Sequence, residues 1–149
     1  EEAQARFLAG EAAGVAGQAP VRAFVSAVCT HDWQALLELL ASDFAFDDHR
    51  TLGMGVLDRE SWVASVRAQD DLTRDLAVED LCTLAWNRSG RVTLRRIFGT
   101  NLEGGPFENV FVNLMLCEGD LVQRLEAFDL DDAERAVARF HELCATKPA

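Results

Sequence analysis

Lysine is almost absent from this sequence, and basic side chains are few in general. Of the 149 residues, 14 are lysine or arginine and 25 are aspartate or glutamate, so the net charge is −11. Lys147 is the only lysine, and Arg95 and Arg96 are the only adjacent basic pair. Without a basic cluster the chain has little with which to neutralise phosphate groups. We therefore expect neither nucleic acid nor a membrane as a partner.

Long apolar runs and closely spaced cysteines are also missing. No run approaches the roughly 20 apolar residues that a membrane-spanning helix needs, and the acidic start EEAQARF lacks the basic flank of a signal peptide. The four cysteines, Cys29, Cys82, Cys117 and Cys144, form no CxxC motif and have apolar neighbours. These features predict buried, reduced thiols in a soluble protein of the cytoplasm.

The hydrophobic residues that are present, 49% of the chain, suffice for one domain with a core. Residues 1–19 are rich in alanine, glutamate and glycine and contain few large apolar side chains. We expect a linker or a loosely docked helix there. Residues 20–146 show regular apolar periodicities and are predicted to form the domain.

The periodicity predicts a definite order of elements. Two short helices follow Pro20, a strand covers Ser42 to Arg50, and Asp58 caps a third helix. The period then changes to two, which predicts four long antiparallel strands, and Asp131 or Asp132 caps a final helix. This order indicates an α+β fold, a bent antiparallel sheet covered on one face by about three to four helices.

The predicted first strand, SDFAFDDHR, carries most of the chemistry. Alternation places one set of side chains on one face and a second set on the other: Phe44, Phe46 and Asp48 against Ala45, Asp47 and His49. A carboxylate that follows two apolar residues into a core is either costly or functional. The alternative is a solvated strand end that runs into a flexible turn at Gly53 and Gly55.

In this order of elements the chain resembles the nuclear transport factor 2-like superfamily, in particular the SnoaL-like proteins, which include ketosteroid isomerases, polyketide cyclases and limonene epoxide hydrolases. The resemblance covers Pro20 to Cys144. It rests on HDWQALLELLASDFAFDDHR, on DRESWVASV after the glycine turn, and on GDLVQRLEAFDLDD before the last helix. It implies a cone-shaped sheet, the cystatin-like roll, around a pocket that works without a cofactor.

The resemblance also implies site residues. In ketosteroid isomerases the general base is an aspartate at the end of this strand, a position that corresponds to Asp48. Those enzymes hold the developing oxyanion with a tyrosine and a protonated aspartate, whereas this chain has no tyrosine. The position that corresponds to this protonated aspartate is occupied by Phe111 here, and Asn109 and Asn113 lie on the same face of that strand. The oxyanion-binding groups are therefore missing or replaced.

Asp48 and His49 are the candidate catalytic residues. In an apolar cone Asp48 would act as a general base, and the alternative is a buried ion pair with Arg50 or Arg95. His49 would titrate near neutrality. Alternation places His49 on the face of the strand opposite to Asp48, unless a bulge redirects it. This placement favours a hydrogen-bonded histidine at the rim of the sheet.

The candidate substrate-binding residues are Arg50, Trp62, Asn109, Phe111 and Asn113. The two asparagine amides would bind a ligand carbonyl or pair across a dimer interface, and the aromatic rings would form core or pocket wall. No set of side chains has the spacing of a metal site.

Together these features favour a small-molecule pocket protein, a cofactor-independent isomerase, cyclase or hydratase that acts by proton transfer on an apolar polyketide-, terpenoid- or steroid-like molecule. The alternative is a non-catalytic ligand-binding or dimerisation module of a larger regulatory protein. Both faces of the strand Phe107 to Cys117 carry apolar residues, so we also expect a homodimer through the sheet.

Overall fold

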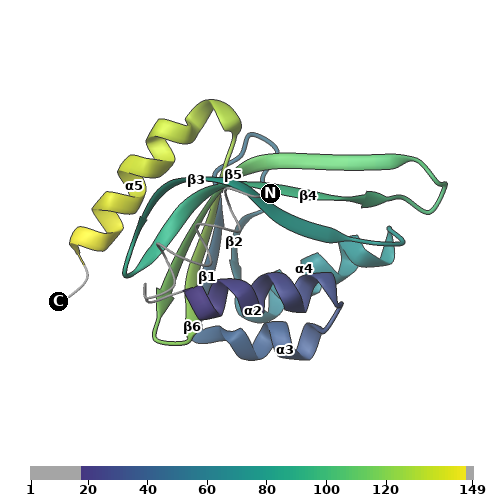
Figure 1. Cartoon of the computed structure of the whole chain (residues 1–149), viewed down its shortest axis with the longest axis horizontal. Coiled ribbons are helices and arrows are strands. Elements are labelled where there is room, and N and C mark those ends of the chain that lie inside the picture. Colours follow the sequence, from purple (N-terminus) through teal and green to yellow (C-terminus); the bar gives the residue numbers. More distant parts are fainter. Residues whose placement is uncertain (1–17, 147–149) are drawn as a thin grey trace.

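The computed structural model describes residues 18–146, so the predicted linker lies almost wholly outside the described residues. The elements in chain order are α2 (Gln18–Cys29), α3 (Trp33–Leu39), β1 (Leu40–Asp48), β2 (Gly55–Asp58), α4 (Arg59–Asp71), β3 (Ala77–Asn87), β4 (Gly90–Thr100), β5 (Pro106–Glu118), β6 (Leu121–Phe128), the 3-10 turn η2 (Leu130–Asp132) and α5 (Ala133–Ala145). In Figure 1 the strands form one curved sheet and the helices pack against it.

The six strands lie in the order β2-β1-β6-β5-β4-β3. β1 runs parallel to β6, and every other pair is antiparallel. The predicted α+β fold with a long antiparallel meander is thereby confirmed. The short strand β2 was not predicted. The glycines around it indicate a turn, and the segment is a strand because residues 55–58 pair antiparallel with residues 45–48 across the loop.

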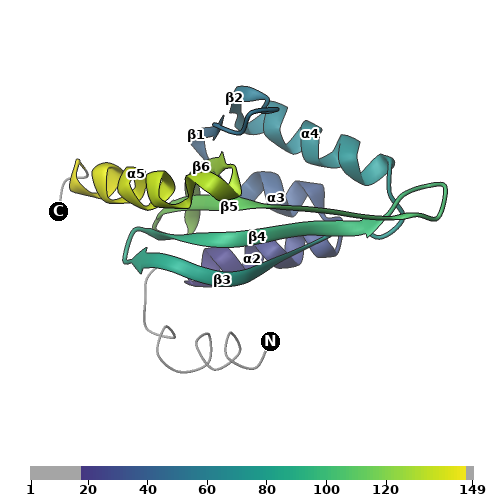
Figure 2. The same cartoon turned by 90° about the horizontal axis from the view of Figure 1, so that it is seen from above.

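Helices cover both faces of the sheet. Helices α2, α3 and α4 lie against one face, where Phe24, Leu36 and Trp62 pack with Phe111 and Met115. Figures 1 and 2 show α5 on the opposite side of the sheet. We call the face under α2, α3 and α4 the cone face and the other the outer face.

On the outer face α5 buries the apolar side of β5. Val112 and Leu114 have no exposed surface within the single chain, and Ala136 and Phe140 of α5 pack against them. These side chains need no second subunit to cover them, which corrects the reason given for a homodimer. The homodimer itself stays a prediction.

Side-chain capping marks the start of α4 and is absent at the start of α5. The Asp58 side chain accepts a hydrogen bond from the Ser61 amide at 2.8 Å, so the predicted cap of α4 is confirmed. Asp132 occupies the corresponding position of α5 but makes no side-chain capping bond, because the chain enters that helix through η2. None of the helices in residues 18–146 is long and apolar enough to cross a membrane.

The prediction that all four thiols are buried is wrong for two of them. None of the four forms a disulfide; Cys117 is buried and Cys144 partly so, whereas Cys29 and Cys82 are exposed. Cys82 lies on the edge strand β3 beside a bulge that shifts the alternation of that strand, and Cys29 is the last residue of α2.

Candidate functional site

A small cavity lies between the cone face and helices α2 and α4. Its volume is about 60 Å³, and its walls are mostly apolar, with Phe24, Phe46, Leu76, Val78 and Leu125 among them. All five predicted substrate-binding residues line it: Arg50, Trp62, Asn109, Phe111 and Asn113. Asn109, Phe111 and Asn113 share a face through the alternation along β5, Arg50 follows the end of β1, and Trp62 lies on α4.

Asp48 lies on the cone face, as the alternation of side chains after Phe44 and Phe46 predicts. Its side chain has no exposed surface. Nε and Nη2 of Arg50 donate to Oδ1 and Oδ2 of Asp48, both at 2.8 Å, and the Met54 amide donates to Oδ2 at 3.0 Å. The carboxylate thus forms a bidentate ion pair with Arg50. A buried ion pair was one of the two roles that the sequence left open for Asp48, the other being a general base.

The environment keeps Asp48 ionised. Burial alone would raise its pKa, but the hydrogen bonds from Arg50 and the Met54 amide, with the charge of Arg50, lower the pKa below its usual value. Gly53 permits this enclosure, because a Cβ there would lie 2.8 Å from Cγ of Asp48. Asp48 lies behind Arg50 and is not among the residues that line the cavity.

A second ion pair of the same kind faces the cavity from the neighbouring strands. Nε and Nη2 of Arg95 donate to Oδ1 and Oδ2 of Asp80 at 2.8 and 3.2 Å, and the Thr93 hydroxyl donates to Oδ1 at 3.1 Å. Burial would raise the pKa of Asp80, but Arg95 and Thr93 lower it. Asp80 was not among the predicted site residues. It is two residues from the apolar Val78, and this spacing in a strand puts its carboxylate on the same face as Val78.

Each of the two guanidinium groups also lies over an aromatic ring. The Arg50 guanidinium carbon is 4.8 Å from the centre of the Phe111 ring, and that of Arg95 is 5.0 Å from the centre of the Phe24 ring. These cation–π contacts hold both arginines at the cavity wall.

Two buried nitrogens on the cone face have no hydrogen-bond partner among residues 18–146. They are Nδ2 of Asn113, which lines the cavity, and one terminal nitrogen of Arg91. Both residues are only 3% exposed. Unpaired buried donors are rare in folded proteins and need an explanation. We call Asp48, Arg50, Asp80, Arg95 and Asn113 the cone site.

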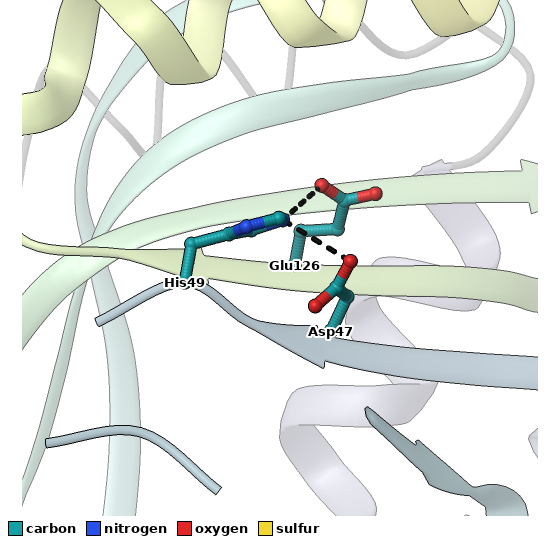
Figure 3. Close-up of side chains that lie close together, drawn as sticks. All are labelled: Asp47, His49 and Glu126. Carbon is teal, nitrogen blue, oxygen red and sulfur yellow. Dashed lines mark hydrogen bonds and ion pairs between the residues drawn. The ribbon is translucent and has the colours of Figure 1, made fainter. Parts of the chain in front are cut away.

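His49 lies on the outer face, apart from Asp48, as its parity predicts. Figure 3 shows it with Asp47 and Glu126. Nε2 of His49 lies 2.8 Å from Oε1 of Glu126 and 3.3 Å from Oδ2 of Asp47, and its ring stacks on Phe128 with the centres 4.5 Å apart. This is the hydrogen-bonded histidine that the sequence favoured.

Arginines complete this group on the outer face. Glu126 has no exposed side-chain surface, and it accepts hydrogen bonds from Nε of Arg124 and, at 3.2 Å, from Nε of Arg139. Burial would raise the pKa of Glu126, but Arg124, Arg139 and His49 lower it. We call Asp47, His49, Arg124, Glu126 and Arg139 the outer cluster.

The ligand atoms of Asp47, His49 and Glu126 lie within 4.8 Å of one another, a spacing suited to a metal ion. Both oxygens of Glu126 are already engaged by guanidinium groups, which would repel a cation. The outer cluster is therefore a self-neutralising network of charges.

Solved structures share this fold. Penicillium brasilianum PrhC superimposes with a TM-score of 0.66 at 14% identity, over 87% of this chain and 90% of that one. A Δ5-3-ketosteroid isomerase from Mycobacterium sp. gives 0.63 at 19%, over 77% and 93%. An NTF2-like protein from Anabaena variabilis gives 0.58 at 19%, over 72% and 81%.

Sequence comparison adds nothing to these likenesses, since no protein-family model and no curated protein matches the chain. At these identities the structural matches establish the architecture. The chain has the fold of NTF2-like and ketosteroid isomerase-like proteins, which confirms the fold that the sequence resemblance implied.

Proposed function

We propose that this protein binds a small, largely apolar molecule in the cone and holds an oxygen atom of that molecule at the cone site. The observation that supports this most is the unpaired Nδ2 of Asn113, a buried hydrogen-bond donor in the wall of a mostly apolar cavity. An acceptor atom on a ligand would satisfy it.

The two arginines add donors to the same cavity. Arg50 and Arg95 each use Nε and Nη2 to hold an aspartate, and Nη1 of each makes no hydrogen bond to the described residues. Both side chains line the cavity and are fixed by their carboxylates and by the rings beneath them. Donors held in place in this way bind an oxygen with little loss of conformational freedom.

A second candidate function is proton transfer by Asp48, in a cofactor-independent isomerase, cyclase or hydratase. It is favoured by the position of Asp48 at the end of β1 on the cone face and by the shared fold with a ketosteroid isomerase. Against it, the lowered pKa makes Asp48 a weak base, and Arg50 stands between it and the cavity. Ligand binding is therefore the function that the geometry supports better.

Binding is tested by blocking the cavity from its rim. Asn109 is an exposed residue that lines the cavity, so Asn109→Trp should fill it without disturbing the core. Octanamide, a neutral apolar probe with one amide oxygen, is titrated calorimetrically into the wild type and the variant. We expect the affinity to fall about tenfold or more, which corresponds to about 1.4 kcal/mol.

The matched control is Glu108→Trp, an exposed neighbour on the same strand whose side chain alternates to the other face. It should leave the affinity unchanged. An absence of octanamide binding in the wild type, or equal binding in both variants, would remove the proposed function.

Catalysis has its own test. Asp48→Asn keeps the shape of the side chain and removes the base, and the conversion of 3-cyclohexenone to its conjugated isomer can be followed by ultraviolet absorbance. If Asp48 transfers the proton, the rate should fall by about 10²–10⁴-fold. If the wild type does not accelerate this reaction, or the variant keeps the wild-type rate, proton transfer by Asp48 to this class of ketone is ruled out.

A further inference from the structure

The buried and partly buried side chains of the cone face carry more positive than negative charge. The charged side chains that face the inside of the cone with little exposure are Asp48, Arg50, Asp80, Arg91 and Arg95. Three arginines against two aspartates leave one positive charge without a counter-charge. The remaining buried carboxylate, Glu126, lies on the outer face with arginines of its own.

Arg91 is the source of the excess. It is 3% exposed, one of its terminal nitrogens has no hydrogen-bond partner, and it forms no ion pair with the described residues. Asp80, the carboxylate whose charge acts on Arg91, is already held by Arg95 and Thr93. Burial and the neighbouring charge of Arg95 lower the pKa of Arg91, although Asp80 opposes them. An uncompensated buried charge is costly, so its retention requires a reason.

The strand register connects Arg91 with the cavity. Thr93 lies opposite Asn113 on β5, and Arg91 is two residues further along the same face of β4, about 7 Å away along the strand. At that separation inside a protein the charge still acts on an ion held at Asn113, because little water screens it. Asn113 would then contact the ion, and Arg91 would act on it through the field.

A place for the rest of a ligand adjoins the cavity. A groove of about 340 Å³ shares Gln69, Ile97 and Asn109 with the cavity wall and continues past the exposed Leu72 and partly buried Phe107. The cavity itself, at about 60 Å³, has room for a small polar head and not for a polycyclic molecule. A linear apolar chain could run from the cavity past Asn109 into the groove.

From these observations we infer that the ligand is an organic acid, whose carboxylate lies at Asn113, Arg50 and Arg95 and whose apolar body follows the groove beyond Asn109. The anion supplies the counter-charge that Arg91 lacks and the acceptor that Asn113 lacks. This inference rests on the proposed binding function and adds to it the charge of the ligand. The cone face thus carries an excess of positive charge although the whole chain has a net charge of −11.

The test compares two probes of the same length that differ in charge, octanoate and octanamide. Both are titrated calorimetrically into the whole chain at neutral pH. We expect octanoate to bind about tenfold or more tightly than octanamide. Equal affinities would overturn the organic-acid inference and leave the proposed binding function intact, whereas the absence of binding by either probe would overturn both.

Two variants locate the effect. Arg91→Met removes the excess charge and keeps an unbranched side chain, so octanoate should bind about tenfold more weakly while octanamide changes by less than about twofold. Arg67→Met, at an exposed position of α4, is the matched control and should change neither affinity.

Asn113→Leu is the second variant, and it keeps the size of the side chain while removing the unpaired donor. Because that donor has no partner in the described chain, the substitution should leave the melting temperature unchanged or raise it. Octanoate affinity should fall about fivefold. If octanoate binds as tightly to both folded variants as to the wild type, the carboxylate does not lie where we place it.

Discussion

Asp47 and Asp48 are adjacent in the chain, yet β1 sends them to opposite faces of the sheet and into two different kinds of polar site. In the outer cluster Glu126 receives donors from two arginines and from His49, and Arg124 also approaches Asp47 at 3.5 Å. In the cone site each aspartate is held by one arginine, and donors remain that no described residue satisfies.

The difference lies in how completely each site satisfies its own charges. The outer cluster neutralises itself and ties β1, β6 and α5 together, so its chemistry is structural. The cone site keeps an unpaired amide in a mostly apolar wall, and the neighbouring Arg91 adds a positive charge without an ion-pair partner among the described residues. Neither feature stabilises the fold in the absence of a ligand. Incomplete satisfaction, more than the presence of acids or histidine, therefore distinguishes the candidate binding site.

The largest effect should come from the centre of the outer cluster. Glu126→Ala leaves Arg124 and Arg139 without their shared carboxylate in a site where the glutamate has no exposed surface. We expect the free energy of unfolding in urea to fall by about 3 kcal/mol. Glu142→Ala, which removes an exposed partner of Arg139 at 3.8 Å, is the control and should cost less than about 0.5 kcal/mol. Equal losses would show that the outer cluster is not structural.

A smaller loss should follow Asp48→Asn in the cone site. The variant gives up the ion pair with Arg50, but the Arg50 side chain is already 18% exposed and can turn to water. We expect about 2 kcal/mol of destabilisation in the same urea experiment. The exposed Asp43→Asn on the same strand should be near neutral. A cost as large as that of Glu126→Ala would mean that both sites serve stability equally.

Acid should weaken the two sites through the same linkage. The pKa values of Asp48 and Glu126 lie below their unfolded values of 3.8 and 4.5, so their stabilisation is present above those values and is lost as pH falls through the lowered ones. Each unit of lowering contributes about 1.4 kcal/mol. Between about pH 6 and pH 3, the free energy of unfolding in urea should therefore decrease less for Glu126→Gln than for the wild type. Parallel profiles would contradict the lowered pKa of Glu126.

Much of the architecture could be predicted because it depends on local signals. The alternation of Phe44, Phe46 and Asp48 predicted the buried face of β1 correctly, and Asp58 predicted the first turn of α4 as its N-cap. The period of two along β5 brought Asn109, Phe111 and Asn113 to one cavity, although their roles as ligand contacts remain predictions.

The features that were missed depend on pairing between distant segments. Asp80 reaches Arg95 only through the register of β3 on β4, and β2 is a strand only because it pairs with β1. Asp47 lies opposite Glu126 because β1 and β6 are parallel, which periodicity does not reveal. A one-residue shift in any of these registers would send the side chains to other faces. The satisfied and unsatisfied charges that separate the two sites therefore require the structure.

The smallest expected effect concerns His49, which sequence analysis held as a possible acid or base. His49→Phe keeps an aromatic ring over Phe128 and removes the hydrogen bond to Glu126, which retains both arginines. We expect a loss of about 0.5–1 kcal/mol in urea unfolding. His49→Ala removes the stacking as well and should cost about 1 kcal/mol more. Octanoate and octanamide should bind both variants as they bind the wild type, since His49 lies on the face away from the cavity. A change in the affinity of either probe in His49→Phe, with stability preserved, would show that the outer cluster and the cone site are coupled across β1 and would end the separation drawn between them.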